Sequence, residues 1–166
     1  RVRYNDVSST DCVDLTWLTP RIAVGGGIWN DANMIEVVRA GTTHIIDMQI
    51  EFDDTSLADP YGIDVLWNPT DDDFQSKPAK VFEAGVEFAL AALDQPETKL
   101  FVHCAAGVHR APMMTLALLR VLGWSLDDAR RLIEERRPVA DFADVYVKSV
   151  ENFVRNYKAP SRPLRH

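Results

Sequence analysis

The fold of this chain is decided by Phe101-Val102-His103-Cys104-Ala105-Ala106-Gly107-Val108-His109-Arg110-Ala111-Pro112. The apolar run at 100–102 is typical of a strand that is buried on both faces. The apolar stretch at 111–122 predicts a helix. A buried strand, a tight loop and a helix together form the repeating unit of parallel sheets, in which ligands bind at the carboxyl ends of the strands.

The same alternation of strands and helices extends through the chain. Short apolar runs predict further strands at 16–18, 21–24, 44–48 and 65–67, the first two as a hairpin. Helical periodicity and capping residues predict helices at 31–39, 78–92, 126–136 and 145–157, and 51–60 is expected to be an acidic loop. The expected fold class is therefore α/β, with a central, mainly parallel sheet flanked by helices.

Length and composition indicate one globular domain. We expect it to cover 1–166, with a core at about 14–157 between a flexible N-terminal arm and a flexible C-terminal tail. The net charge of −7 argues against general nucleic-acid binding. No apolar run approaches the ~20 residues that span a bilayer. We expect a cytoplasmic monomer without a membrane or nucleic-acid partner.

The loop between Cys104 and Arg110 has the features of a phosphate-binding site. Gly107 allows the backbone to curl, so that successive N–H groups converge on an anion. The helix that follows adds the positive end of its dipole, and Arg110 offers a planar fork for two phosphate oxygens. The expected phosphate-binding residues are Ala105, Ala106, Gly107, Val108, His109 and Arg110.

The chain has two cysteines, Cys12 and Cys104. Their spacing makes no zinc motif, and we expect neither a metal nor a cofactor. Cys12 is interpreted as a small, partly buried side chain. Positive surroundings lower the pKa of a thiol from ~8.5 to about 3.5–7.5, so we expect Cys104 to attack phosphorus as a thiolate.

Three further positions are candidates for supporting this chemistry. The acidic turn at 69–73 can protonate a leaving oxygen and then activate water, and repulsion among its adjacent carboxyls is expected to raise the pKa of one of them. His103 is expected to support the loop through hydrogen bonds. His109 is expected to project toward the rim of the loop, where it either contacts substrate or is simply exposed.

These motifs resemble the protein tyrosine phosphatase superfamily, most closely its compact dual-specificity group. The signature His-Cys-x5-Arg, with a glycine three positions after the cysteine, is present here as His103, Cys104, Gly107 and Arg110. Pro69 and Asp72 are similar to the Pro-x-x-Asp acid loop. The resemblance implies a metal-independent phosphomonoesterase with a phosphocysteine intermediate and Asp72 as the general acid, with Asp71 as the fallback.

One departure from the pattern is Ala111, because the family usually has Ser or Thr there to assist departure of the thiolate. Arg-Ala-Pro is similar to the loops of phosphoglucan phosphatases and regenerating-liver phosphatases. Three functions therefore remain open: a phosphatase of phosphotyrosine, phosphoserine and phosphothreonine proteins, a phosphatase of phosphoglucan or a small metabolite, and a catalytically weak phospho-binding module. Trp29, Trp67 and Trp124 are candidates for a sugar platform in the second case.

Overall fold

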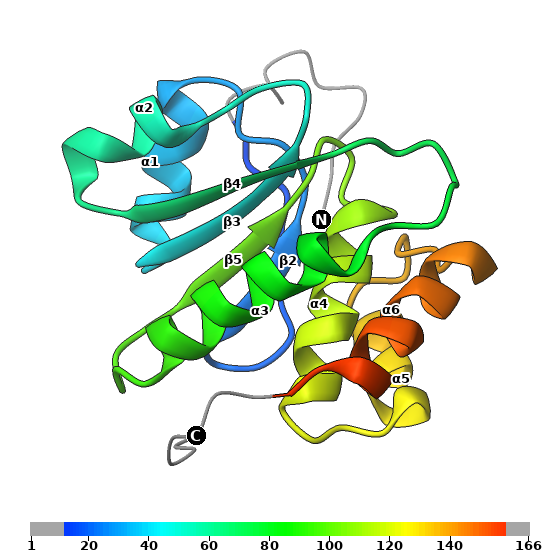
Figure 1. Ribbon diagram of the computed structural model, residues 1–166. Helices are drawn as coiled ribbons and strands as arrows, with labels where there is room; N and C mark the ends of the chain where they lie inside the picture. The colour runs from blue at the N-terminus through cyan, green and yellow to red at the C-terminus, as the bar shows by residue number, and fades with distance from the viewer. Residues whose placement is uncertain (1–11, 159–166) are drawn as a thin grey trace.

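The computed structural model describes residues 12–158, so most of the expected N-terminal arm and the tail at 159–166 lie outside the described residues. Five strands form one sheet in the order β1-β2-β5-β3-β4 (Figure 1). Strands β2, β5, β3 and β4 are parallel, and β1 is antiparallel to β2. The strands are β1 (Leu15–Trp17), β2 (Ile22–Gly25), β3 (His44–Gln49), β4 (Asp64–Thr70) and β5 (Leu100–His103).

Helices cover both faces of this sheet, as predicted for an α/β fold. One face carries α1 (Asp31–Arg39) and α2 (Thr55–Ala58), which is followed by a 3-10 turn, η2 (Asp59–Tyr61). The other face carries the remaining helices: α3 (Ala79–Leu93), α4 (Arg110–Val121), α5 (Leu126–Arg136) and α6 (Asp144–Asn156).

The central strand β5 divides the core into two layers. Phe101 faces the layer of α1 and α2, whereas Leu100 and Val102 face the layer of α3–α6. All four residues of β5 are buried, in agreement with its continuous apolar sequence. Cys104 follows directly at the carboxyl end of this strand, and α4 begins at Arg110. The loop between β5 and α4 therefore lies at the carboxyl end of the central strand of the sheet.

The largest difference from the predicted elements lies in 51–60, which was expected to be a loop. It contains α2 and η2 because Leu57 and Ala58 pack into the core beneath α1. The backbone N–H of Asp54, at the start of α2, also donates to the buried carboxylate of Asp47. One helical turn is too short to produce a helical period in the sequence.

Candidate active site

The loop after β5 directs its carbonyl groups outward, toward the surrounding scaffold. The carbonyl of Ala105 accepts from the backbone N–H of Gly27 at 3.0 Å, and that of Val108 accepts from Asp141 at 2.9 Å. The guanidinium of Arg137 donates to the carbonyls of Ala106 and Gly107 at 3.5 and 2.8 Å. The His109 carbonyl is taken up by the first turn of α4.

This arrangement turns the N–H groups of the loop inward. In a trans peptide, the carbonyl of one residue and the N–H of the next point in opposite directions. The N–H groups of residues 106–110 therefore face the inside of the loop. Gly107, with φ 70°, makes the curl possible. The predicted anion nest is thus present in the backbone.

The Cys104 side chain lies at the floor of this nest. Its Sγ accepts hydrogen bonds from the backbone N–H groups of Gly107 and Ala111, both at 3.3 Å. Such donors stabilise a negative charge on sulfur. The thiol is free and buried. Cys12 is also free but is exposed, so the expectation of partial burial was wrong; the residue precedes β1 and lies outside the packed layers.

Arg110 is buried and held in one orientation by an acidic partner that the sequence did not reveal. Its Nη1 and Nη2 donate to the two carboxylate oxygens of Glu51, each at 3.0 Å, and Nη1 also donates to the Thr70 carbonyl at 2.7 Å. The bonds from Arg110 lower the pKa of Glu51. Burial alone would lower the pKa of Arg110, but the contact with Glu51 and the nearby acidic groups raise it.

These contacts leave one edge of the guanidinium open. A guanidinium has five N–H donors, and Glu51 and Thr70 take both donors of Nη1 and one of Nη2. The remaining donors are the second N–H of Nη2 and that of Nε, which is buried without a hydrogen-bond partner among the described residues. Two parallel N–H groups on one edge are the geometry that binds two phosphate oxygens.

Asp72 lies beside the loop, as the acid-loop motif predicts. Its Oδ2 is 3.0 Å from Nδ1 of His109, and its Oδ1 accepts from the Tyr146 hydroxyl at 2.8 Å. The other ring nitrogen of His109, Nε2, is 3.1 Å from Asp141 Oδ2. His109 is thus partly buried between two carboxylates. Burial, followed by the bond to Asp72, raises the pKa of Tyr146 to about 12.

The neighbours of Asp72 make other contacts. Asp71 is exposed, and its carbonyl accepts from Lys77 Nζ at 2.6 Å. Asp73 pairs with the same ammonium group, and this hydrogen bond lowers the pKa of Asp73. Asp73 is therefore not the carboxyl whose pKa repulsion was expected to raise, because Lys77 pairs with it. Of the three aspartates, Asp72 is the one that contacts the nucleophile loop.

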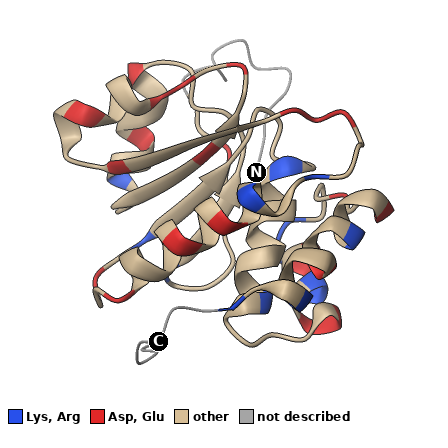
Figure 2. Cartoon of the chain, in the orientation of Figure 1, with Lys and Arg blue, Asp and Glu red and all other residues tan. Residues whose placement is uncertain are grey.

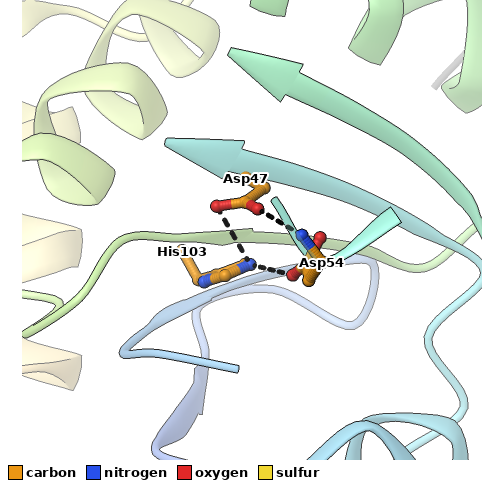
Figure 3. A group of neighbouring side chains, drawn as sticks. All are labelled: Asp47, Asp54 and His103. Carbon is orange, nitrogen blue, oxygen red and sulfur yellow. Dashed lines mark hydrogen bonds and ion pairs between the residues drawn. The ribbon is translucent and has the colours of Figure 1, made fainter. Parts of the chain in front are cut away.

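His103 is fully buried behind the nucleophile, together with two aspartates (Figure 3). Its Nε2 is 2.8 Å from Oδ2 of Asp54 and 3.7 Å from Oδ1 of Asp47. Among the described residues, these three form the one group whose histidine, cysteine or carboxylate atoms lie close enough to hold a metal ion. Each is also hydrogen-bonded within the cluster, which fits the supporting role expected for His103. Burial, reinforced by the charge of Asp54, raises the pKa of Asp47 to about 9.

Four residues of the site were not found from the sequence: Glu51, Arg137, Asp141 and Tyr146. Each acts through a partner far away in the chain, as in the ion pair of Arg137 with Asp14 at 2.6 Å. No local spacing identifies such pairs.

Figure 2 shows acidic residues on many elements, with an acidic stretch directly after β4. Within residues 12–158, the structure has no helix of the length and apolarity needed to cross a membrane.

A buried thiol in a ring of backbone donors, with an arginine at the start of the following helix, can bind a phosphate group directly beside a nucleophile. Residues 30–155 match the family described as "Dual specificity phosphatase, catalytic domain", and the chain belongs to this family.

The chain is also similar to two curated proteins whose names describe tyrosine phosphatases. It is 26% identical over 165 residues to "Tyrosine-protein phosphatase vhp-1" of Caenorhabditis elegans, covering 92% of this chain and 24% of the relative. It is 26% identical over 73 residues to "Protein-tyrosine-phosphatase IBR5" of Arabidopsis thaliana, covering 43% and 28%. The chain spans about a quarter of the length of these relatives.

Solved structures share the fold. PTPMT1 in complex with PI(5)P has a TM-score of 0.75 at 20% identity, covering 85% of this chain and 94% of that one. The active form of Tk-PTP has a TM-score of 0.76 at 18% identity, with coverages of 87% and 98%. DUSP15 has a TM-score of 0.73 at 22% identity, with coverages of 86% and 88%.

The buried carboxyl of Asp47 predicts how stability depends on pH. Its pKa is raised in the folded state, so above pH ~4 the unfolded chain releases a proton that the folded chain keeps. This contribution to the free energy of unfolding should therefore decrease as pH rises from ~4 to about 9. Urea denaturation at pH 5, 7 and 8.5 should show a smaller decrease for Asp47→Asn than for the wild type. Parallel curves for the two proteins would contradict the assignment.

The Arg110–Glu51 pair predicts that Glu51 affects anion binding. Replacing Glu51 with Gln removes one of two charged hydrogen bonds and should loosen the guanidinium. Since the pair is partly exposed, the loss should be about 1 kcal/mol, or roughly a fivefold rise in the inhibition constant of inorganic phosphate. Glu36→Gln, which breaks the surface pair with Arg39, is the control and should leave the constant unchanged. Tighter phosphate binding by Glu51→Gln would show that Glu51 competes with the anion instead.

Proposed function

We propose that this chain hydrolyses phosphate monoesters through a phosphocysteine intermediate at Cys104, and that its substrates are phosphotyrosine, phosphoserine and phosphothreonine proteins. The observation that carries the chemistry is the inward-facing ring of loop N–H groups above Sγ, together with the open edge of Arg110. These donors can hold the three non-bridging oxygens of a phosphoryl group while sulfur attacks phosphorus.

In the first step, the Cys104 thiolate forms a bond to phosphorus and the ester P–O bond breaks. Asp72 gives its proton to the leaving oxygen. In the second step, Asp72 takes a proton from a water molecule, whose oxygen attacks phosphorus and releases the thiolate. Ala111 contributes its backbone N–H to Sγ at 3.3 Å but has no hydroxyl to assist this release.

A protein substrate is supported by the two curated relatives, whose names describe tyrosine phosphatases. It also fits the residues around the loop. Ala106, at the top of the nest, is exposed, and the half-exposed ring of Phe74 lies against His109 at the rim. These two apolar groups beside the phosphate site can contact the protein surface around a phosphorylated side chain.

A second candidate is a non-protein phosphomonoester, such as phosphoglucan or a small phosphometabolite. It is favoured by the structural neighbour PTPMT1, which was solved with PI(5)P. Trp29 and Trp67 are exposed, whereas Trp124 packs against the core. Trp29 and Trp67 are therefore the tryptophans that are more available to a sugar, and Trp124 is partly buried.

The catalytic roles predict the behaviour of three variants with phenyl phosphate, whose leaving oxygen needs a proton. Cys104→Ser should lose nearly all turnover, because a hydroxyl is a much weaker nucleophile than a thiolate. Asp72→Ala should lose roughly 10²-fold or more in kcat, while Asp71→Ala, its matched neighbour, should change little. Unchanged turnover in Cys104→Ser would eliminate the mechanism, whereas negligible turnover by the unsubstituted chain would leave a phospho-binding module. A loss confined to Asp71→Ala would move the acid to that residue.

The substrate class predicts an order of specificity constants. We expect kcat/KM to be highest for phosphotyrosine and phosphothreonine peptides, and lower for phosphorylated amylopectin and inositol phosphates. Steady-state phosphate release under one set of conditions measures all four. Preference for either non-protein substrate would replace the first candidate with the second.

A further inference from the structure

His109 lies between two carboxylates and takes no part in the two steps proposed for Cys104 and Asp72. Its Nδ1 is 3.0 Å from Oδ2 of Asp72, and its Nε2 is 3.1 Å from Oδ2 of Asp141. The His109 and Asp72 side chains are partly buried, with exposed fractions of 20% and 30%, whereas Asp141 is exposed at 69%. The acid side of the site is thus a chain of three titratable groups that runs from the loop to solvent.

We propose that His109 and Asp72 together hold the proton that the leaving oxygen receives. The inference rests on the proposed function, in which Asp72 is the general acid. A carboxylic acid hydrogen-bonded to a neutral imidazole, and a carboxylate bonded to an imidazolium, differ only in the position of one proton. At 3.0 Å that proton can lie on either Oδ2 or Nδ1.

The proton count of this pair balances over the two steps. In the first step, the singly protonated pair gives up one proton to the leaving oxygen, and the P–O bond breaks. Asp72 is then a carboxylate and His109 a neutral imidazole whose Nε2–H donates to Asp141. In the second step, the attacking water loses a proton to Asp72 as the P–S bond breaks, which restores the pair.

Other groups around His109 set its charge environment. Tyr146 donates to the second oxygen of Asp72, and the Phe74 ring lies edge-on to the imidazole at 4.9 Å. Within the loop, the neighbouring titratable and charged groups are Cys104 and the guanidinium of Arg110, the latter paired with Glu51. Lys77 is paired with Asp73. Asp72 and Asp141 are therefore the groups that directly contact the ring nitrogens.

The position of the acid loop does not depend on His109 alone. Phe74 has a φ of 56°, and its N–H donates to the Tyr146 hydroxyl at 3.0 Å, while its ring stacks on that of Tyr146. The N–H of Lys77 donates to Oγ of Ser149 at 3.0 Å. Because these anchors on α6 hold the loop of Asp72, a substitution at His109 can remove the imidazole that shares the proton while the loop stays in position.

A pair that keeps its proton to higher pH than a lone carboxyl changes the pH profile of the first step. An isolated carboxyl ionises above pH ~4 and an imidazolium above pH ~6.5. The alkaline limb of kcat/KM, which reports the steps up to the phosphocysteine, should therefore extend toward the imidazole range. The contribution should be large for a poor leaving group and small for p-nitrophenolate, which needs no proton.

The test is the pH profile of kcat/KM for His109→Gln with phenyl phosphate and with p-nitrophenyl phosphate. A glutamine amide can still donate to Asp72 but cannot carry the proton. With phenyl phosphate, the alkaline limb should move to lower pH, with a loss of roughly 10- to 100-fold at pH 7.5 and a smaller loss at pH 5. With p-nitrophenyl phosphate, the loss should be about threefold or less. Asp141→Asn should move the limb in the same direction by less, because Asp141 is exposed.

Two comparisons separate this inference from the general mechanism. His44→Gln, a control outside the site, should leave both profiles unchanged. The inference would be overturned if Asp72→Asn lost activity while the alkaline limb of kcat/KM for His109→Gln matched that of the wild type. The proposal that Asp72 is the general acid would then still stand. An equal loss for both substrates at every pH would reduce His109 to a structural contact. Full kcat/KM of Asp72→Asn with phenyl phosphate would remove the general acid and this inference with it.

Discussion

The outward bonding of the loop carbonyls is the constraint on which the rest of the site depends. Converging N–H groups repel one another, so a free chain would not hold them together without an anion. Gly27 and Asp141 each donate a hydrogen bond to one loop carbonyl, and Arg137 donates to two. These bonds fix the loop in that form. A buried carbonyl without a partner costs about 1–3 kcal/mol, so these bonds also stabilise the fold. The donors are therefore in place before the phosphate arrives, which is the condition for electrostatic catalysis.

The proposed anion site lies in a chain that is acidic overall. Glu51, Asp72 and Asp141 lie within the site or at its rim, and the whole chain has a net charge of −7. Recognition must therefore come from short-range donors: backbone amides, the dipole of α4 and one edge of Arg110. Glu51 neutralises part of the positive charge of Arg110, but it also fixes the orientation of the guanidinium plane. The arrangement favours a ligand of defined shape over anions in general.

The parts of the site that were predicted from the sequence are the parts built locally. Cys104, Gly107 and Arg110 lie within one strand–loop–helix unit, where spacing along the chain determines position in space. The mainly parallel sheet was predicted because strands alternate with helices along the chain. Glu51 and Tyr146 were missed because they reach Arg110 and Asp72 across 59 and 74 positions. His109 was placed at the rim, but its carboxylate partners come from two other loops and leave no local pattern.

The anchoring of the acid loop on α6 has a consequence for the order in which the molecule is made. The ribosome completes the nucleophile loop well before it adds Tyr146 and Ser149, which hold Phe74 and Lys77 in place. A nascent chain that ends within α5 can thus contain Cys104, Arg110 and Asp72 without an ordered acid loop. Domains fold as units once their last packing element is available. Synthesis of α6 is then the event that orders the loop of Asp72 beside the loop of Cys104.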